Sequence, residues 1–140
     1  MALGIAFGWN PERAHKPAGL RTHLLVSLGS AIMMLISLEM YYLYNSATTS
    51  VDPGRIAAQV VSGIGFIGAG TIMHADGGLV KGLTTAASIW AVSGVGMACG
   101  AGMYMLAVAG TVVTLISLAL VNRIIMSNGS GASEGKQKKD

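Results

Sequence analysis

The feature that most constrains this chain is an uninterrupted stretch without any charged residue, which covers residues 82–122. A helix rises about 1.5 Å per residue and a bilayer core is about 30 Å thick, so roughly 20 apolar residues cross a membrane once. The stretch is about twice that length, and Gly100-Ala101-Gly102 interrupts it near its middle. We therefore predict two membrane-spanning helices, at about 82–99 and 103–122, joined by a tight turn.

Three further apolar segments precede this stretch. Residues 24–44 contain one charge, Glu39, and residues 56–75 contain none, so each is long enough for one span. Residues 1–9 reach only about half the bilayer thickness, which predicts a short or truncated first helix. Only 11% of the residues are charged, whereas about a quarter are in soluble domains. The predicted fold is all-α, a polytopic transmembrane bundle of about five helices within a domain at 1–126.

The distribution of Lys and Arg predicts the orientation, because cytoplasmic loops carry an excess of both. Of the nine basic residues only Arg55 lies on one side of the predicted membrane. The other eight lie on the opposite side: Arg13, Lys16, Arg21, Lys81, Arg123, Lys136, Lys138 and Lys139. This side should be the cytoplasm, with the C-terminus inside and the N-terminus outside. Residues 127–140 are small, polar and charged, so we expect a disordered cytoplasmic tail.

Small residues mark the faces on which the predicted helices pack, because lipid gives helices no hydrophobic reason to associate. We expect a tightly packed bundle with Gly, Ala and Ser at its contacts. The pattern is compatible with packing inside the chain, with a homo-oligomer, and with docking on another integral membrane protein. The candidate glycines are Gly63, Gly65, Gly68, Gly70, Gly94, Gly96 and Gly100, of which the last two form a GxxxG.

No sequence feature indicates enzymatic chemistry. Residues 63–68 match GxGxxG, but they lie inside a predicted span, whereas a dinucleotide-binding fingerprint follows a strand and opens a helix. The sequence contains no Walker, HExxH or GxSxG signature. We expect no enzyme and no cofactor, with Mg²⁺ as a conceivable ligand or signal only. The basic residues separate apolar segments, so the expected partner is the lipid bilayer rather than nucleic acid.

A polar cluster is predicted at the outer mouth of the 56–75 span. Asp52 at the helix N-cap followed by Pro53 at the first helical position would be explained by capping alone. Alternatively Asp52, Arg55 and Gln59, one helical turn further, bind an ion or a charged residue of a partner. Glu39 is a functional candidate because a charge inside a span is costly, although its position near neighbouring tyrosines also fits an interfacial carboxylate. If Glu39 reaches inward, its natural partner is Arg55.

The segment before residue 24 is a Pro/Gly turn that we expect on the cytoplasmic side. Thr22 is the predicted N-cap of the following span. Thr84 and Thr85 should cap the 82–99 span, or else hydrogen-bond to a neighbouring helix. The loop charges either act as topology signals or form a docking loop for proteins or anionic lipid headgroups. The loop candidates are Lys16, Arg21 and His23.

Three blocks of this sequence resemble the MgtC/SapB family of bacterial inner-membrane proteins. They are KPAGLRTHLLVSLGSA from Lys16, DPGRIAAQVVSGIGFIGAGTIM from Asp52, and VKGLTTAASIWAVSGVGMACGAG from Val80. The resemblance implies about five transmembrane helices and a non-enzymatic role in growth at low magnesium, with virulence in some pathogens. It implies association with other membrane proteins, notably inhibition of the ATP synthase through its membrane subunits; magnesium uptake is the alternative. The chain departs from this pattern in three ways. Its first helix is short, and it has a polar tail where longer relatives carry a soluble C-terminal domain. At Thr84 the virulence-associated branch has Asn.

Overall fold

The computed structural model describes residues 2–8, 18–75 and 79–129 of the chain. In chain order they form α1 (Ala2–Gly8), α2 (Leu20–Tyr44), α3 (Gly54–Ala69), β1 (Met73–Ala75), β2 (Leu79–Lys81), α4 (Leu83–Gly100) and α5 (Tyr104–Gly129). The predicted all-α class is confirmed, with one addition. Strands β1 and β2 form a small antiparallel hairpin in which Met73 is opposite Lys81.

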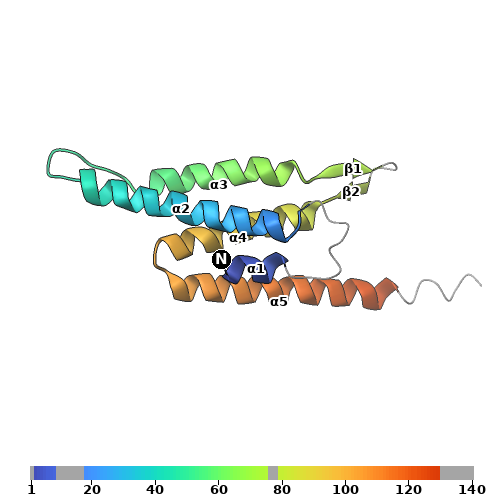
Figure 1. Ribbon diagram of the computed structural model, residues 1–140. Helices are drawn as coiled ribbons and strands as arrows, with labels where there is room; N and C mark the ends of the chain where they lie inside the picture. The colour runs from blue at the N-terminus through green and yellow to red at the C-terminus, as the bar shows by residue number, and fades with distance from the viewer. Residues whose placement is uncertain (1, 9–17, 76–78, 130–140) are drawn as a thin grey trace, which may run out of the picture.

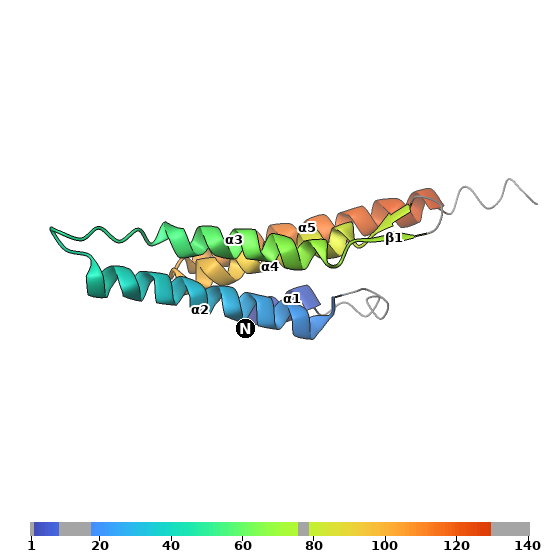
Figure 2. The same cartoon turned by 90° about the horizontal axis from the view of Figure 1, so that it is seen from above.

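The helices lie roughly along one axis, so the bundle has two ends (Figures 1 and 2). At the hairpin end, α2 and α4 begin and α3 leads into β1 and β2 (Figure 1). At the loop end, residues 45–53 connect α2 to α3, and α4 turns into α5 at Gly102, whose φ is +74°. Arg21 and Lys81 flank the hairpin end, whereas Asp52 and Arg55 flank the loop end. The described basic residues therefore separate between the ends as the sequence predicts.

Helix α4 is the centre of the bundle and contacts α1, α2, α3 and α5. Its backbone lies close to that of α2 at Gly96 and Gly100. A Cβ atom at Gly96 would overlap the carbonyl oxygen of Ser27, and one at Gly100 would lie 2.5 Å from that of Ala31. The GxxxG that Gly96 and Gly100 form therefore packs against α2 within the bundle.

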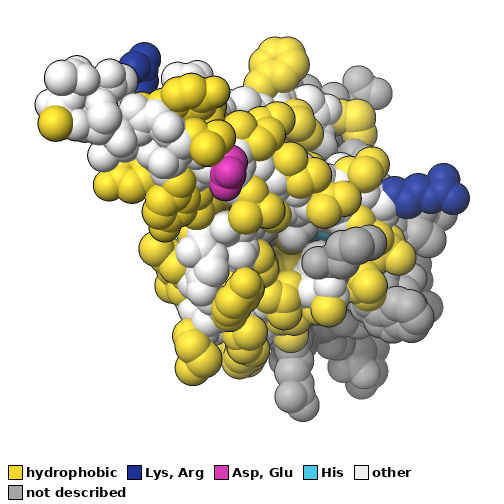
Figure 3. All heavy atoms as spheres, turned by 60° about the vertical axis from the view of Figure 1, so that its left-hand side comes forward, with side chains coloured by type: hydrophobic (Ala, Val, Ile, Leu, Met, Phe, Trp, Pro, Cys, Tyr) yellow, Lys and Arg dark blue, Asp and Glu magenta, His cyan; other side chains and the backbone are white. Residues whose placement is uncertain are grey.

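The polarity of the bundle is inverted relative to a soluble domain, in which apolar side chains are inside. Among the described residues, nine polar side chains are buried against seven apolar ones, while 27 large hydrophobic side chains are exposed. Figure 3 shows hydrophobic side chains spread over most of the face in view. Water would penalise such a surface, whereas lipid is its natural solvent.

Helix lengths agree with this environment. Helices α2 and α4 are long and apolar enough to cross a membrane, and α3 and residues 104–120 of α5 are apolar but shorter. With 18 residues, α4 is about 27 Å long, close to the roughly 30 Å of a bilayer core. Together, the exposed apolar surface and the helix lengths indicate a helical membrane bundle.

Several helix ends differ from the predicted ones. Helix α3 ends at Ala69 rather than near residue 75, and the Thr71 hydroxyl donates a hydrogen bond of 2.7 Å to the Gly68 carbonyl oxygen. Such local bonds compete with helix continuation, and the chain turns into β1 instead. At the other end of the chain, α5 continues to Gly129, three residues into the segment expected as a tail. Residues 130–140 lie outside the described part.

The predicted threonine caps are wrong. Helix α2 begins at Leu20, so Thr22 lies inside it. The N-cap residue is Gly19, which has no side chain to cap the helix. Helix α4 begins after Gly82, again without a side-chain cap, so Thr84 and Thr85 lie in its first turn. Gly82 has a φ of +94°, and a Cβ there would overlap the Thr71 carbonyl oxygen. Glycine is therefore required where β2 turns into α4.

Candidate functional site

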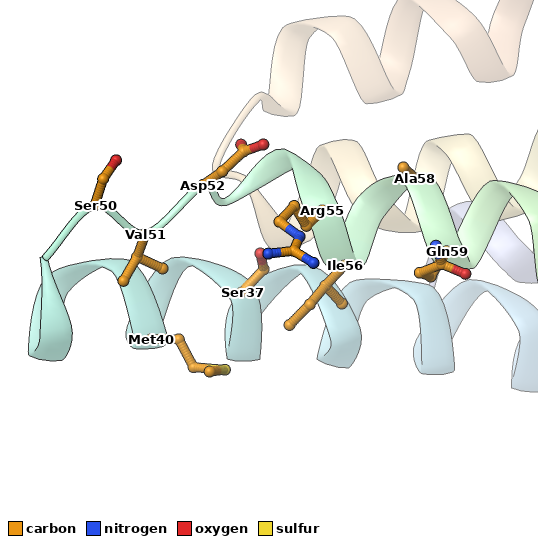
Figure 4. A pocket seen from close by; sticks show the side chains of 9 residues that line it. All are labelled: Ser37, Met40, Ser50, Val51, Asp52, Arg55, Ile56, Ala58 and Gln59. Atoms are coloured by element: carbon orange, nitrogen blue, oxygen red, sulfur yellow. The ribbon is translucent and has the colours of Figure 1, made fainter.

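An open groove of about 590 Å³ with charged and polar residues in its lining lies at the loop end, between α2 and the start of α3 (Figure 4). Three of the four residues predicted as a polar cluster line it, namely Asp52, Arg55 and Gln59. Glu39 is exposed on α2 and does not line the groove. The other lining residues are Ser37, Met40, Ser50, Val51, Ile56 and Ala58.

The predicted N-cap of α3 is wrong by one residue, because Asp52 lies one position before the N-cap. Its carboxylate Oδ1 accepts a hydrogen bond of 2.7 Å from the Gly54 backbone N–H, and Pro53 takes the N-cap position. The buried Ser37 hydroxyl donates a hydrogen bond of 2.5 Å to the Pro53 carbonyl oxygen, which ties α2 to this start. The Asp52 side chain is otherwise exposed, so its charge is available to a ligand in the groove.

Arg55 carries the positive charge of the groove. In Figure 4 its guanidinium extends toward α2 near Ser37, whereas the Asp52 carboxylate points away from α2. Between described residues, no ion pair joins Arg55 to either Asp52 or Glu39, so the structure does not form the conditional Glu39–Arg55 pair. An exposed guanidinium without a carboxylate partner is well suited to bind an anionic group.

The predicted packing glycines separate into two groups. The first group contacts a neighbouring element or ends a helix. It comprises Gly68, where an added Cβ would lie 3.6 Å from Ala86 of α4, Gly70 at the C-cap of α3, and Gly96 and Gly100 against α2. A Cβ added at Gly63, Gly65 or Gly94 would meet no heavy atom within 4 Å. Only this second group leaves open space beside its helix.

The predicted cytoplasmic loop residues also separate. Arg21 is exposed, and Lys16 lies outside the described residues. His23, which we expected in the cytoplasmic loop, is instead fully buried in the first turn of α2. Its Nδ1 lies 2.9 Å from the Gly19 carbonyl oxygen and its Nε2 lies 3.0 Å from the Ser88 hydroxyl.

Sequence reasoning missed the polar contacts that join α2 to α4. Besides the His23–Ser88 contact, the hydroxyls of Ser30 and Ser93 lie 2.8 Å apart and are buried. The available signal was the spacing of Ser27, Ser30 and Ser37, which places three hydroxyls on one face of α2. Polar side chains in membranes mark contacts between helices, so this face could have been identified as a contact face of α2, on which Ser27 and Ser30 meet α4 and Ser37 meets the start of α3.

The described residues include no group of three or more His, Cys, Asp or Glu side chains that could together hold a metal ion. His74 and Asp76 are not part of this statement, because their side chains lie outside the described residues.

Comparison with known proteins gives matches over most of the chain. The model of the MgtC family matches residues 1–126. An uncharacterized protein of Haemophilus influenzae is 42% identical over 122 residues, which are 86% of this chain and 51% of that protein. No solved structure matches.

Two relatives with informative names match at similar levels. The protein named "Putative magnesium transporter YhiD" of Escherichia coli strain K12 is 44% identical over 120 residues, covering 85% of this chain and 55% of the relative. Protein MgtC of Salmonella typhimurium strain LT2 is 45% identical over 122 residues, covering 86% and 48%. The chain thus spans about half the length of the curated relatives it matches.

Proposed function

Because the chain belongs to the MgtC family of membrane proteins, we propose that it is a non-enzymatic regulator of the bacterial inner membrane that acts by binding other integral membrane proteins during adaptation to low magnesium. The proposed partners are membrane subunits of the ATP synthase. The proposed topology is multi-pass, with the hairpin end and the C-terminus in the cytoplasm, in line with the positions of Arg21 and Lys81.

The observation that carries this proposal is the outward face of α3, which we call the docking face: Ser62, Gly65, Phe66 and Ala69. All four residues are exposed, and their spacing places them on one side of the helix. The Phe66 ring is 84% exposed, and a Cβ at Gly65 would meet nothing within 4 Å. A partner helix could approach closely at Gly65 and pack against the projecting ring.

The opposite side of α3 is already occupied. Ile64 is buried in a cluster with Ile89 of α4, and Gly68 lies against Ala86. Helix α3 is therefore anchored to the bundle by one side, which leaves the docking face as a rigid, outward surface.

Crosslinking tests the proposal. The tagged chain is crosslinked in magnesium-starved cells, extracted in mild detergent and analysed by mass spectrometry. We expect ATP synthase membrane subunits to be recovered with the wild-type chain and lost with Gly65→Leu, because the leucine fills the space at the docking face. Gly94→Leu is the matched control, since Gly94 of α4 is also open but lies on another helix. If Gly65→Leu leaves both partner recovery and growth at low magnesium intact, the docking proposal is wrong.

A magnesium or other ion pathway is the second candidate, favoured by the polar groove with Asp52 and Gln59 and by the name of the YhiD relative. Carboxylates and amide oxygens are ligands that Mg²⁺ accepts. This function predicts that metal flux into vesicles reconstituted with the chain falls with Asp52→Asn or Gln59→Leu. Unchanged flux in both variants would count against it.

A further inference from the structure

The seam between α2 and α3 contains a second groove, of about 420 Å³, beside the polar one. On α3 the two grooves share one stripe, because Ile56 lines the first and Val60, Gly63 and Ile67 line the second. These residues follow one another at intervals of four, three and four, so they lie on one side of the helix. The two grooves are therefore successive parts of one seam that leads from the loop end into the apolar part of the bundle.

Two glycines create the space in the apolar part of the seam. A Cβ at Gly29 of α2 or at Gly63 of α3 would meet no heavy atom within 4 Å, so the helix surfaces stand apart there. Ser30 is the only residue with a polar side chain among those that line this part, and its hydroxyl already contacts Ser93. The groove therefore suits a hydrocarbon chain.

The length of the seam matches one bilayer leaflet. Ile56 and Ile67 are eleven residues apart on α3, which corresponds to about 16 Å along the helix. Half of a bilayer core of about 30 Å is about 15 Å. A lipid chain that begins beside Ile56 would thus remain in the seam over the whole depth of its own leaflet.

The charges at the mouth of the seam specify the headgroup. Arg55 offers a guanidinium without an ion-pair partner among the described residues. Asp52 offers an exposed carboxylate that points away from α2 (Figure 4). Guanidinium groups bind phosphate through paired hydrogen bonds, and a carboxylate attracts an ammonium group. One phosphate and one ammonium are the charges of the phosphoethanolamine headgroup, whereas phosphatidylglycerol carries an uncharged glycerol beyond its phosphate and would leave the Asp52 carboxylate without a cation.

We propose that the α2–α3 seam binds one phosphatidylethanolamine molecule, with its phosphate on Arg55, its ammonium near Asp52 and one acyl chain along Gly29 and Gly63. This site is separate from the docking face, because Gly63 and Gly65 are about 200° apart around α3. The lipid proposal and the regulator proposal can therefore fail independently.

Native mass spectrometry of the delipidated full chain in detergent, titrated with phosphatidylethanolamine or phosphatidylglycerol of identical acyl chains, measures the proposed binding. We expect wild type to bind phosphatidylethanolamine more tightly, by about fivefold or more. Arg55→Gln should weaken that binding roughly tenfold, because a hydrogen-bonded charge is lost. Gly63→Leu should weaken it similarly by filling the seam. Gly65→Leu is the control on the same helix and should bind as wild type does.

A further variant isolates the headgroup preference. Asp52→Asn keeps an oxygen that can accept the Gly54 N–H bond but removes the charge, so we expect it to bind the two lipids equally well. Equal binding of the two lipids by wild type would overturn the headgroup assignment. Unchanged binding in both Arg55→Gln and Gly63→Leu, or an equal loss in Gly65→Leu, would overturn the site. A photocrosslinker at Met33 in membranes should label lipid, and exclusive labelling of a protein would show that the seam holds a partner helix instead.

Discussion

Replacing Gly96 by alanine should force α2 and α4 apart. The added Cβ would overlap the Ser27 carbonyl oxygen and lie 3.0 Å from two carbon atoms of the same backbone. No side-chain rotation relieves a clash with backbone, so we expect a shift of about 1 Å, and such overpacking costs about 1–3 kcal/mol. The shift would also break the 2.8 Å contact between the Ser30 and Ser93 hydroxyls, at about 0.6 kcal/mol in a membrane.

Alanine partly offsets this loss, because it favours a helix over glycine by about 1 kcal/mol. The expected net loss in the free energy of unfolding is therefore about 0.5–2.5 kcal/mol. Titration with SDS in mixed micelles, followed by circular dichroism of the helices, measures it. Gly94→Ala is the control, since Gly94 is exposed and open, and it should be neutral or stabilising by up to about 1 kcal/mol. If both variants unfold at the same SDS fraction, the close approach of α2 and α4 is refuted.

Three further predictions concern other parts of the bundle. Gly82→Ala should lower thermal stability more than Gly102→Ala, because both residues have a positive φ but only the Cβ at position 82 meets backbone; equal losses would contradict this. A double-mutant cycle of Ser30→Ala and Ser93→Ala should give a coupling of about 0.6 kcal/mol, and additive losses would exclude their hydrogen bond. Trp90 is 56% exposed on α4. In a variant with no other tryptophan, brominated acyl chains should quench its fluorescence, whereas quenching by aqueous iodide alone would contradict lipid contact.

Hydropathy predicted the helices well where the environment alone decides the structure. The uncharged stretch at 82–122 correctly predicted α4, the turn at Gly102 and the start of α5, because lipid requires apolar helices of bilayer length. Hydropathy does not register where a helix stops inside an apolar segment. The end of α3 at Ala69 depends on local hydrogen bonds of Thr71 and on the hairpin that follows.

Long-range contacts were the part that the sequence could not specify. His23 and Ser88 are 65 residues apart, and no local pattern indicates that a histidine beside a basic loop is buried against a helix four elements later. The candidate groove was partly predictable, because Asp52, Arg55 and Gln59 share one helix start. Glu39 was grouped with them by topology alone, and its exclusion from the groove depends on the rotation of α2, which depends on packing against α4.

The inverted polarity of this bundle also determines which substitutions the chain can accept. Its outward side chains need only be apolar, so Leu, Ile, Val and Met should exchange freely over most of the surface, where a soluble protein would vary between polar residues. Its interior is held at small hydroxyls and glycines, so the narrowest tolerance should lie at Ser27, Ser30, Ser93 and Gly96. A saturation mutagenesis map of this chain should therefore be the reverse of a soluble one, with permissive hydrophobic positions surrounding a restrictive core of the smallest residues.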